Sequence, residues 1–150
     1  PPTQINTKKS AKGGGKLARE IPREKKAPAD IAKAGRILRA VLHAFRNRLT
    51  PNESLQLIAQ LPMLIKAIYV DGWRIGNEAA QMRTLGDFIE AVREEGGRST
   101  INDFVTDREV EHAIHAVFKV LKNHVSEGEI QDIVTTLPAE LRPLLVGKKI

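Results

Sequence analysis

Apolar residues recur in this chain at intervals of three and four positions, the spacing that places side chains on one face of an α-helix. The first stripe follows Asp30, a residue suited to a helix N-cap. It consists of Ile31, Ala34, Leu38, Val41, Leu42, Phe45 and Leu49. A second stripe spans about 107–124, after Thr106 and Glu109 in the Thr-x-x-Glu pattern of a capping box. The pattern predicts two long amphipathic helices.

A shorter apolar stripe lies between these two helices, from about Leu85 to Glu95. The pair Gly96-Gly97 follows it, and glycine favours the left-handed conformation that ends many helices. No segment alternates apolar and polar residues convincingly enough for a strand. We therefore expect an all-α fold of six or seven helices.

The two outer parts of the body repeat each other when the sequence is displaced by 76 positions. The matches fall on caps, prolines and core positions: Leu49-Thr50 with Val125-Ser126, Glu53 with Glu129, and Leu61-Pro62 with Leu137-Pro138. Each half predicts a long helix, then a second helix that is capped by Thr50 or Ser126, with Glu53 or Glu129 at the capping-box position, and that stops at Leu-Pro. A short third helix with proline in its first turn follows. We expect an internal duplication of two three-helix units, about 30–70 and 107–146, joined by the middle helix. Two unrelated helical hairpins of similar length are the alternative.

Charged residues are distributed unevenly along the chain. Residues 1–29 hold eight basic and two acidic side chains, so they carry the whole formal net charge of +6, and residues 30–150 hold 16 of each sign. The basic residues of this segment are Lys8, Lys9, Lys12, Lys16, Arg19, Arg23, Lys25 and Lys26. The segment 1–29 contains prolines, a triple glycine and few large apolar residues. It cannot bury enough apolar surface to offset a backbone entropy of about 1–2 kcal/mol per residue. We predict a flexible basic arm over 1–29 and an all-α domain over 30–150. A solubilising tail without a partner is the alternative interpretation of the arm.

The composition excludes several classes of protein. The chain has 150 residues and no cysteine, which excludes disulfides, thiolate metal sites and a cysteine nucleophile. No apolar run approaches the roughly 20 residues of a membrane span, and no apolar stretch follows the N-terminal charges as in a secretory signal. We expect a soluble, cytoplasmic protein without a membrane span.

Several stretches of the body match a known family pattern. They are 41–50, 59–65 and 69–73 in the first half, and 115–118, 125–129 and 137–142 in the second. Together they resemble a bacterial family known only as domain of unknown function 2267, over roughly residues 34–145. The resemblance implies an all-helical fold. It implies no established reaction, substrate or ligand, and the basic arm lies outside it.

The four histidines are the first candidates for chemistry. His112 and His115 share a helix with Glu109 and Glu111, but an iron site in a helical bundle needs the Glu-x-x-His pattern twice. His43 falls on the polar side of its helix, and the duplication aligns it with a lysine. It aligns the fourth, His124, with an arginine. A polar surface position is the simplest interpretation of all four, so we expect no metal and no cofactor.

Motifs for phosphate binding and nucleophilic catalysis are also missing. Lys12 and Lys16 flank three glycines, but the spacing differs from that of a phosphate-binding loop and no strand precedes it. No serine stands in a Gly-x-Ser-x-Gly turn. We expect no catalytic residues and no enzymatic activity.

Two surfaces of the first half are candidates for partner contacts. Tyr69 and Trp73 either plug the end of the first unit or form an aromatic anchor that faces a partner. Leu55 and Leu64 are apolar where the second half has polar residues. We expect the middle helix to cover them; a protein–protein surface is the alternative.

These patterns predict a non-enzymatic interaction or assembly protein. We expect its arm to dock on an acidic surface of a larger macromolecular complex. The alternative is a nucleic-acid-associated protein whose arm contacts phosphates, although the arm lacks aromatics for base stacking. The sequence leaves a homo-oligomer open.

Overall fold

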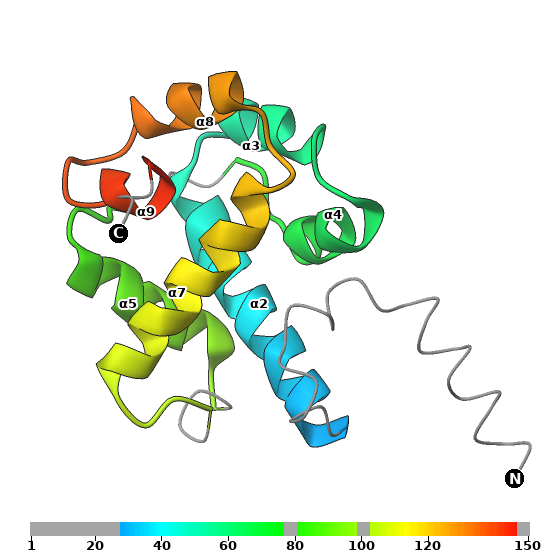
Figure 1. Ribbon diagram of the computed structural model, residues 1–150, viewed down its shortest axis with the longest axis vertical. Coiled ribbons are helices and arrows are strands. Elements are labelled where there is room, and N and C mark those ends of the chain that lie inside the picture. Colours follow the sequence, from blue (N-terminus) through cyan, green and yellow to red (C-terminus); the bar gives the residue numbers. More distant parts are fainter. Residues whose placement is uncertain (1–27, 77–80, 99–102, 147–150) are drawn as a thin grey trace, which may run out of the picture. The chain divides into compact units, whose positions relative to one another are not determined.

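The computed structural model describes residues 28–76, 81–98 and 103–146. Within these ranges the chain forms seven helices and no strand, with a single β-bridge residue at Ile75. The helices are α2 (Pro28–Arg48), α3 (Pro51–Ile58), α4 (Met63–Val70), α5 (Leu85–Gly96), α7 (Asp107–Lys122), α8 (Glu127–Val134) and α9 (Arg142–Val146) (Figure 1). The all-helical class is confirmed. The eight basic residues predicted to bind a partner, from Lys8 to Lys26, lie outside the described residues.

The chain divides into two units, residues 1–36 and 37–150. In the first unit the described residues are the opening turns of α2, where Ile31 is exposed. Helix α2 begins at Pro28, two residues before the predicted cap at Asp30. Proline suits the first turn because the N–H that it lacks has no helical partner there. The first buried residue of α2 is Leu38, in the second unit, and an unbroken buried run follows over residues 40–46.

The core of the second unit is built around three phenylalanine rings. The ring centroids of Phe45 on α2 and Phe118 on α7 lie 4.9 Å apart, edge to face. Phe88 on α5 lies 5.8 Å from Phe118 and 6.4 Å from Phe45. Each ring is at most 2% exposed. Such aromatic pairs contribute about 0.5–1.5 kcal/mol beyond their buried area, and here they join three helices.

Three helices begin at complete capping boxes, two of which the sequence predicts. Thr50 caps α3 with Glu53, and Thr106 caps α7 with Glu109. In each, the threonine oxygen accepts the glutamate N–H and the glutamate accepts the threonine N–H, so two otherwise unpaired donors are satisfied. The third box, Thr84 with its aspartate partner, begins α5. Helix α5 ends at the predicted glycine pair, but Gly97 has φ +60° and ψ −139°, which is not the left-handed helical conformation expected there.

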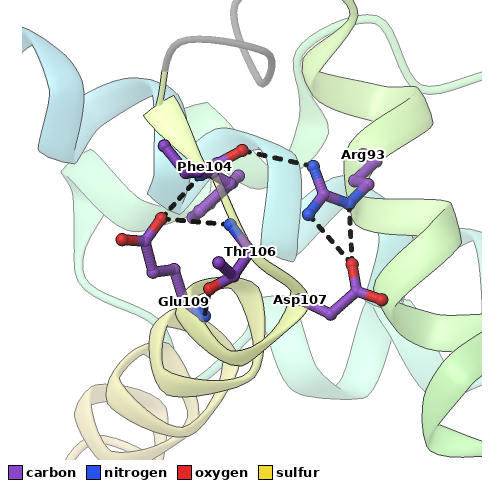
Figure 2. A network of polar contacts seen from close by, with 6 residues as sticks. Arg93, Phe104, Thr106, Asp107 and Glu109 are labelled. Atoms are coloured by element: carbon purple, nitrogen blue, oxygen red, sulfur yellow. Dashed lines mark hydrogen bonds and ion pairs between the residues drawn. The ribbon is translucent and has the colours of Figure 1, made fainter.

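A polar network ties the end of α5 to the start of α7 (Figure 2). Arg93 donates from Nε and Nη2 to one oxygen of Asp107, at 3.1 and 2.9 Å, and from Nη1 to the carbonyl of Phe104 at 3.4 Å. The carboxylate of Glu109 also accepts the N–H of Val105 at 2.6 Å. The network fixes the entry of α7 beside α5, which is the helix pair that brings Phe88 to Phe118.

The short third helices differ in detail from the prediction. Pro62 is the N-cap of α4, with ψ 155°, rather than part of its first turn. In the second half, a turn in which Leu141 N–H donates to Pro138 O at 2.9 Å comes first, and α9 begins only at Arg142. The proline in the first turn of α9 is therefore Pro143.

The prediction that the middle helix covers Leu55 and Leu64 is wrong. Leu55 is 55% exposed and Leu64 is 48% exposed. Helix α5 lies against α7, and α3 instead lies against α8 (Figure 1). The middle helix cannot cover α3 and α4 because its buried face is occupied by α7.

No helix among the described residues has both the length and the apolarity that crossing a membrane requires.

Candidate functional site

A half-open cavity of about 420 Å³ lies where the ends of three helices meet in the second unit. Arg46 and Asn47 line it from the end of α2, and Glu95 from the last turn of α5. The loop after α4 supplies Trp73 and Arg74, among others. The volume falls in the range of about 300–1,000 Å³ that is usual for small-ligand pockets.

A tight turn presents the loop to this cavity. Gly72 has φ +71°, a conformation that glycine adopts without strain. The turn lets Trp73 N–H donate to the carbonyl of Val70 at 3.0 Å. The Trp73 ring then stands edge to face with Tyr69, at 6.3 Å between centroids, and forms part of the cavity wall.

Arg46 is a buried cation whose guanidinium is only partly used. Its side chain is 6% exposed, and Nη1 donates to the carbonyls of Tyr69 and Asp71, each at 2.9 Å. Its Nε is buried and has no hydrogen-bond partner. Burial lowers the pKa of Arg46, while nearby Glu95 acts in the opposite direction. Arginine nevertheless stays protonated in proteins, so the cavity contains a permanent positive charge.

Glu95 does not neutralise Arg46 by direct pairing. Its Oε2 accepts from Asn47 Nδ2 at 2.7 Å, and its Oε1 lies 3.9 Å from His43 Nδ1, beyond hydrogen-bond distance. Among the described residues, Arg46 forms no ion pair. A desolvated charge without a counter-ion is costly, which makes this part of the fold a candidate for anion recognition.

His43 corrects the prediction that all four histidines occupy polar surface positions. It is only 5% exposed, because α4 covers this side of α2, and its Nε2 lies 2.7 Å from the carbonyl of Ile68. That contact assigns the proton to Nε2, which donates to the carbonyl. Burial lowers the pKa of His43, against the effect of the Ile68 carbonyl, so the ring is neutral at pH 7.

The other histidines occupy the second half. His112 and His115 are exposed on α7, and His115 Nε2 lies 3.7 Å from Glu111 on the same helix. His124 is half-buried beyond the end of α7. In the ranges that the structure describes, no three histidine, aspartate or glutamate side chains come together as a metal site.

The two residues of the predicted aromatic anchor differ in burial. Tyr69 is fully buried, and its hydroxyl lies 2.7 Å from Ser54 Oγ, also buried. Tyr69 is thus not available to a partner, and its burial favours the plug over the anchor for this residue. Trp73 is half-buried and lines the cavity, so it remains a candidate contact residue.

Sequence reasoning missed Arg46, the buried charge at the centre of this site. A sequence signal exists: Arg46 follows Leu42 by four positions and Leu38 by eight, which places a cation on the apolar face of α2. The cavity itself has no such signal, because Glu95 and Trp73 come from distant segments.

A family model described as "Uncharacterized conserved protein (DUF2267)" matches residues 20–144 of the chain. The match leaves residues 1–19 outside and includes 20–29, the last part of the predicted arm. A comparison with curated proteins found no match.

Proposed function

The chain belongs to the DUF2267 family of uncharacterized conserved proteins, and from that premise we propose that it is a non-enzymatic interaction protein. Its basic N-terminal arm docks on an acidic protein surface of a larger complex.

The separation of charge along the chain carries this proposal. Residues 1–29 carry the whole net charge of +6, while residues 30–150 are neutral overall. A basic segment joined to a neutral body attracts acidic surfaces over distances set by the salt concentration. Each exposed charge pair is worth about 0–1 kcal/mol, so the arm acts as a group rather than through one lysine.

Apolar residues on the body support a protein partner. Leu55 on α3 is 55% exposed, and on α4 Met63 and Leu64 are 76% and 48% exposed. They would add area that no phosphate backbone could bury. This favours a protein over a nucleic acid as the main partner.

We also propose that the body arose by duplication of one three-helix unit. Matched positions support it: Phe45 and Leu121 are each 2% exposed, and Leu61 and Leu137 are 5% and 3% exposed. Thr50 and Ser126 both cap a following helix. The test is an experimental structure in which residues 37–70 and 113–146 are superposed. Helices that fail to overlay would contradict the duplication.

Capture from native lysate tests the role of the arm. We compare the full chain with a chain that begins at Pro28, with and without nuclease, and identify the captured proteins. A variant with Lys8, Lys9, Lys12 and Lys16 replaced by glutamine keeps the length of the arm and removes half of its cations. The matched control makes the same change at Lys33, Lys66, Lys119 and Lys122, outside the arm.

We expect an acidic protein to be captured by the full chain and by the control, to survive nuclease, and to be lost from the two arm variants. Loss on nuclease treatment would favour the nucleic-acid alternative. Equal capture by the chain that begins at Pro28 would show that the arm is a solubilising tail. The shortened chain should melt at nearly the same temperature as the full chain, because almost no core residue is removed.

A further inference from the structure

Arg46, which lines the cavity at the end of α2, has one edge of its guanidinium without hydrogen-bond partners among the described residues. Arginine binds carboxylates through two parallel N–H donors, and the pair Nε and Nη2 forms one such edge. In Arg46, Nη1 is held by two carbonyls, while neither Nε nor Nη2 bonds to a described residue. The two carbonyl bonds fix the plane of the guanidinium before any ligand arrives.

We propose that this cavity is a binding site for a carboxylate. Arg46 supplies the fixed cation, and Arg74 supplies a second, exposed one. The carboxylate fills the cavity and takes Arg46, which lines it, as its counter-ion; the Nε of Arg46 is itself buried and has no partner among the described residues. Trp73 and Ile75 form an apolar wall for the group that bears the carboxylate.

The charge of the lining favours a singly charged anion. Arg46 and Arg74 contribute two positive charges and Glu95 one negative charge, so the lining is positive by one unit. His43, whose Nδ1 lies 3.9 Å from Glu95, is neutral. Asp71, on the loop that also carries Arg74, pairs with Arg39. A carboxylate balances this lining. A doubly charged phosphate would overcompensate it and would be repelled more strongly by Glu95.

Such a carboxylate has two sources, the C-terminus of a polypeptide and an acidic side chain within one. The shared chemistry is a carboxylate next to an apolar or extended group. Binding here uses only residues of the second unit, so it does not depend on the arm. The two proposals therefore fail independently.

Trp73 makes the site directly observable, because it is the only tryptophan of the chain and it lines the cavity. We titrate the full-length protein with N-acetyl-leucine, which represents a chain end, and follow tryptophan fluorescence. The matched probe is N-acetyl-leucinamide, which lacks only the charge. N-acetylglutamate amidated at its α-carboxyl represents an acidic side chain, and inorganic phosphate tests the choice of anion.

We expect a saturable change in fluorescence with one or both carboxylates, and none with the amide. The carboxylate that binds more tightly identifies the source. Phosphate should bind more weakly than either. Absence of any saturable response to the carboxylates, or an equal response to the amide or to phosphate, would overturn the proposal.

Substitutions assign the response to the named residues. Arg46→Gln should weaken binding about tenfold to a hundredfold, because it removes a hydrogen-bonded charge worth about 1.5–3 kcal/mol. Arg74→Gln, at an exposed position, should weaken it by up to about fivefold. Glu95→Gln should tighten it, because a negative charge leaves the lining while the acceptor for Asn47 remains. Arg108→Gln, on the exposed face of α7, is the control and should change nothing.

The opposite signs at Arg74 and Glu95 separate recognition of charge from damage to the fold. If Arg46→Gln fails to fold, these two variants still decide the question. Equal affinities for N-acetyl-leucine in the wild type, Arg74→Gln and Glu95→Gln would contradict the site.

Discussion

Gln60 Oε1 accepts the backbone N–H of Ser126 at 2.7 Å, across 66 positions of sequence. In a complete capping box that N–H would bond to Glu129, the third residue of α8. Ser126 Oγ does accept Glu129 N–H, at 3.2 Å, so half of the predicted box forms. The other half is replaced by Gln60, which lies just beyond the end of α3. Glu129 is 8% exposed, and its Oε2 has no partner.

Removal of the Gln60 amide should destabilise the contact between α3 and α8. Gln60→Ala should lower the free energy of unfolding by about 0.5–1.5 kcal/mol, the net value of one hydrogen bond. Urea denaturation measures it. Gln56→Ala, at an exposed position of α3, is the matched control and should have a smaller effect. Equal effects of the two substitutions would contradict a specific role for the Gln60 contact.

The unpaired carboxylate of Glu129 should make stability depend on pH. Burial raises its pKa, and the neighbouring charges of Asp132 and Glu53 raise it further. The folded state then binds the proton of Glu129 more tightly than the unfolded state does. Stability therefore falls as pH rises from the ordinary glutamate pKa through the raised pKa of Glu129. The destabilisation by the buried charge is fully present above the raised pKa and disappears below the ordinary glutamate pKa.

Glu129→Gln should therefore stabilise the protein at pH 7. We expect about 1 kcal/mol, or roughly 2–4 °C in Tm for a chain of this size, from removal of an unpaired buried charge. The gain should shrink as pH falls, because the wild-type residue becomes neutral. Glu140→Gln, at an exposed position, is the control for charge alone. A gain that does not change between neutral and acidic pH would contradict the mechanism.

The buried hydroxyl pair of Tyr69 and Ser54 should behave as one unit. Tyr69→Phe leaves the Ser54 hydroxyl, 0% exposed, without its partner and should cost about 1–3 kcal/mol. Ser54→Ala should restore part of that loss in the double variant, because no buried hydroxyl then remains unpaired. A double-mutant cycle measures the coupling. Strictly additive effects would show that the 2.7 Å contact contributes nothing.

Truncation of Phe118 tests the aromatic centre of the core. Phe118→Ala should cost about 3–5 kcal/mol, the usual range for a buried phenylalanine. The loss includes contacts with the rings of Phe45 and Phe88. Val105→Ala, at a position 78% exposed, should change stability by less than about 0.5 kcal/mol. Thermal denaturation of both variants makes the comparison, and a similar loss in each would place the core elsewhere.

The sequence by itself determined the features that depend on neighbouring residues. Helical periodicity located α2, α5 and α7, and the caps at Thr50 and Thr106 formed as predicted. Side chains three or four positions apart meet on a helix whatever surrounds it. A capping box likewise needs only four consecutive residues. Even the exposed start of α2 follows from a local property, the tolerance of proline in a first turn.

Only the tertiary structure decided which polar groups are buried and which apolar groups are left exposed. His43 has a polar position on its own helix, yet α4 arrives from 25 residues away and buries it against the carbonyl of Ile68. Leu55 has an apolar side chain, yet α5 packs on α7 and leaves it exposed. Glu129 loses its local partner to Gln60, and Arg46 gains a cavity from the loop after α4. Such contacts depend on which helices meet, and a local pattern of residues does not fix that choice.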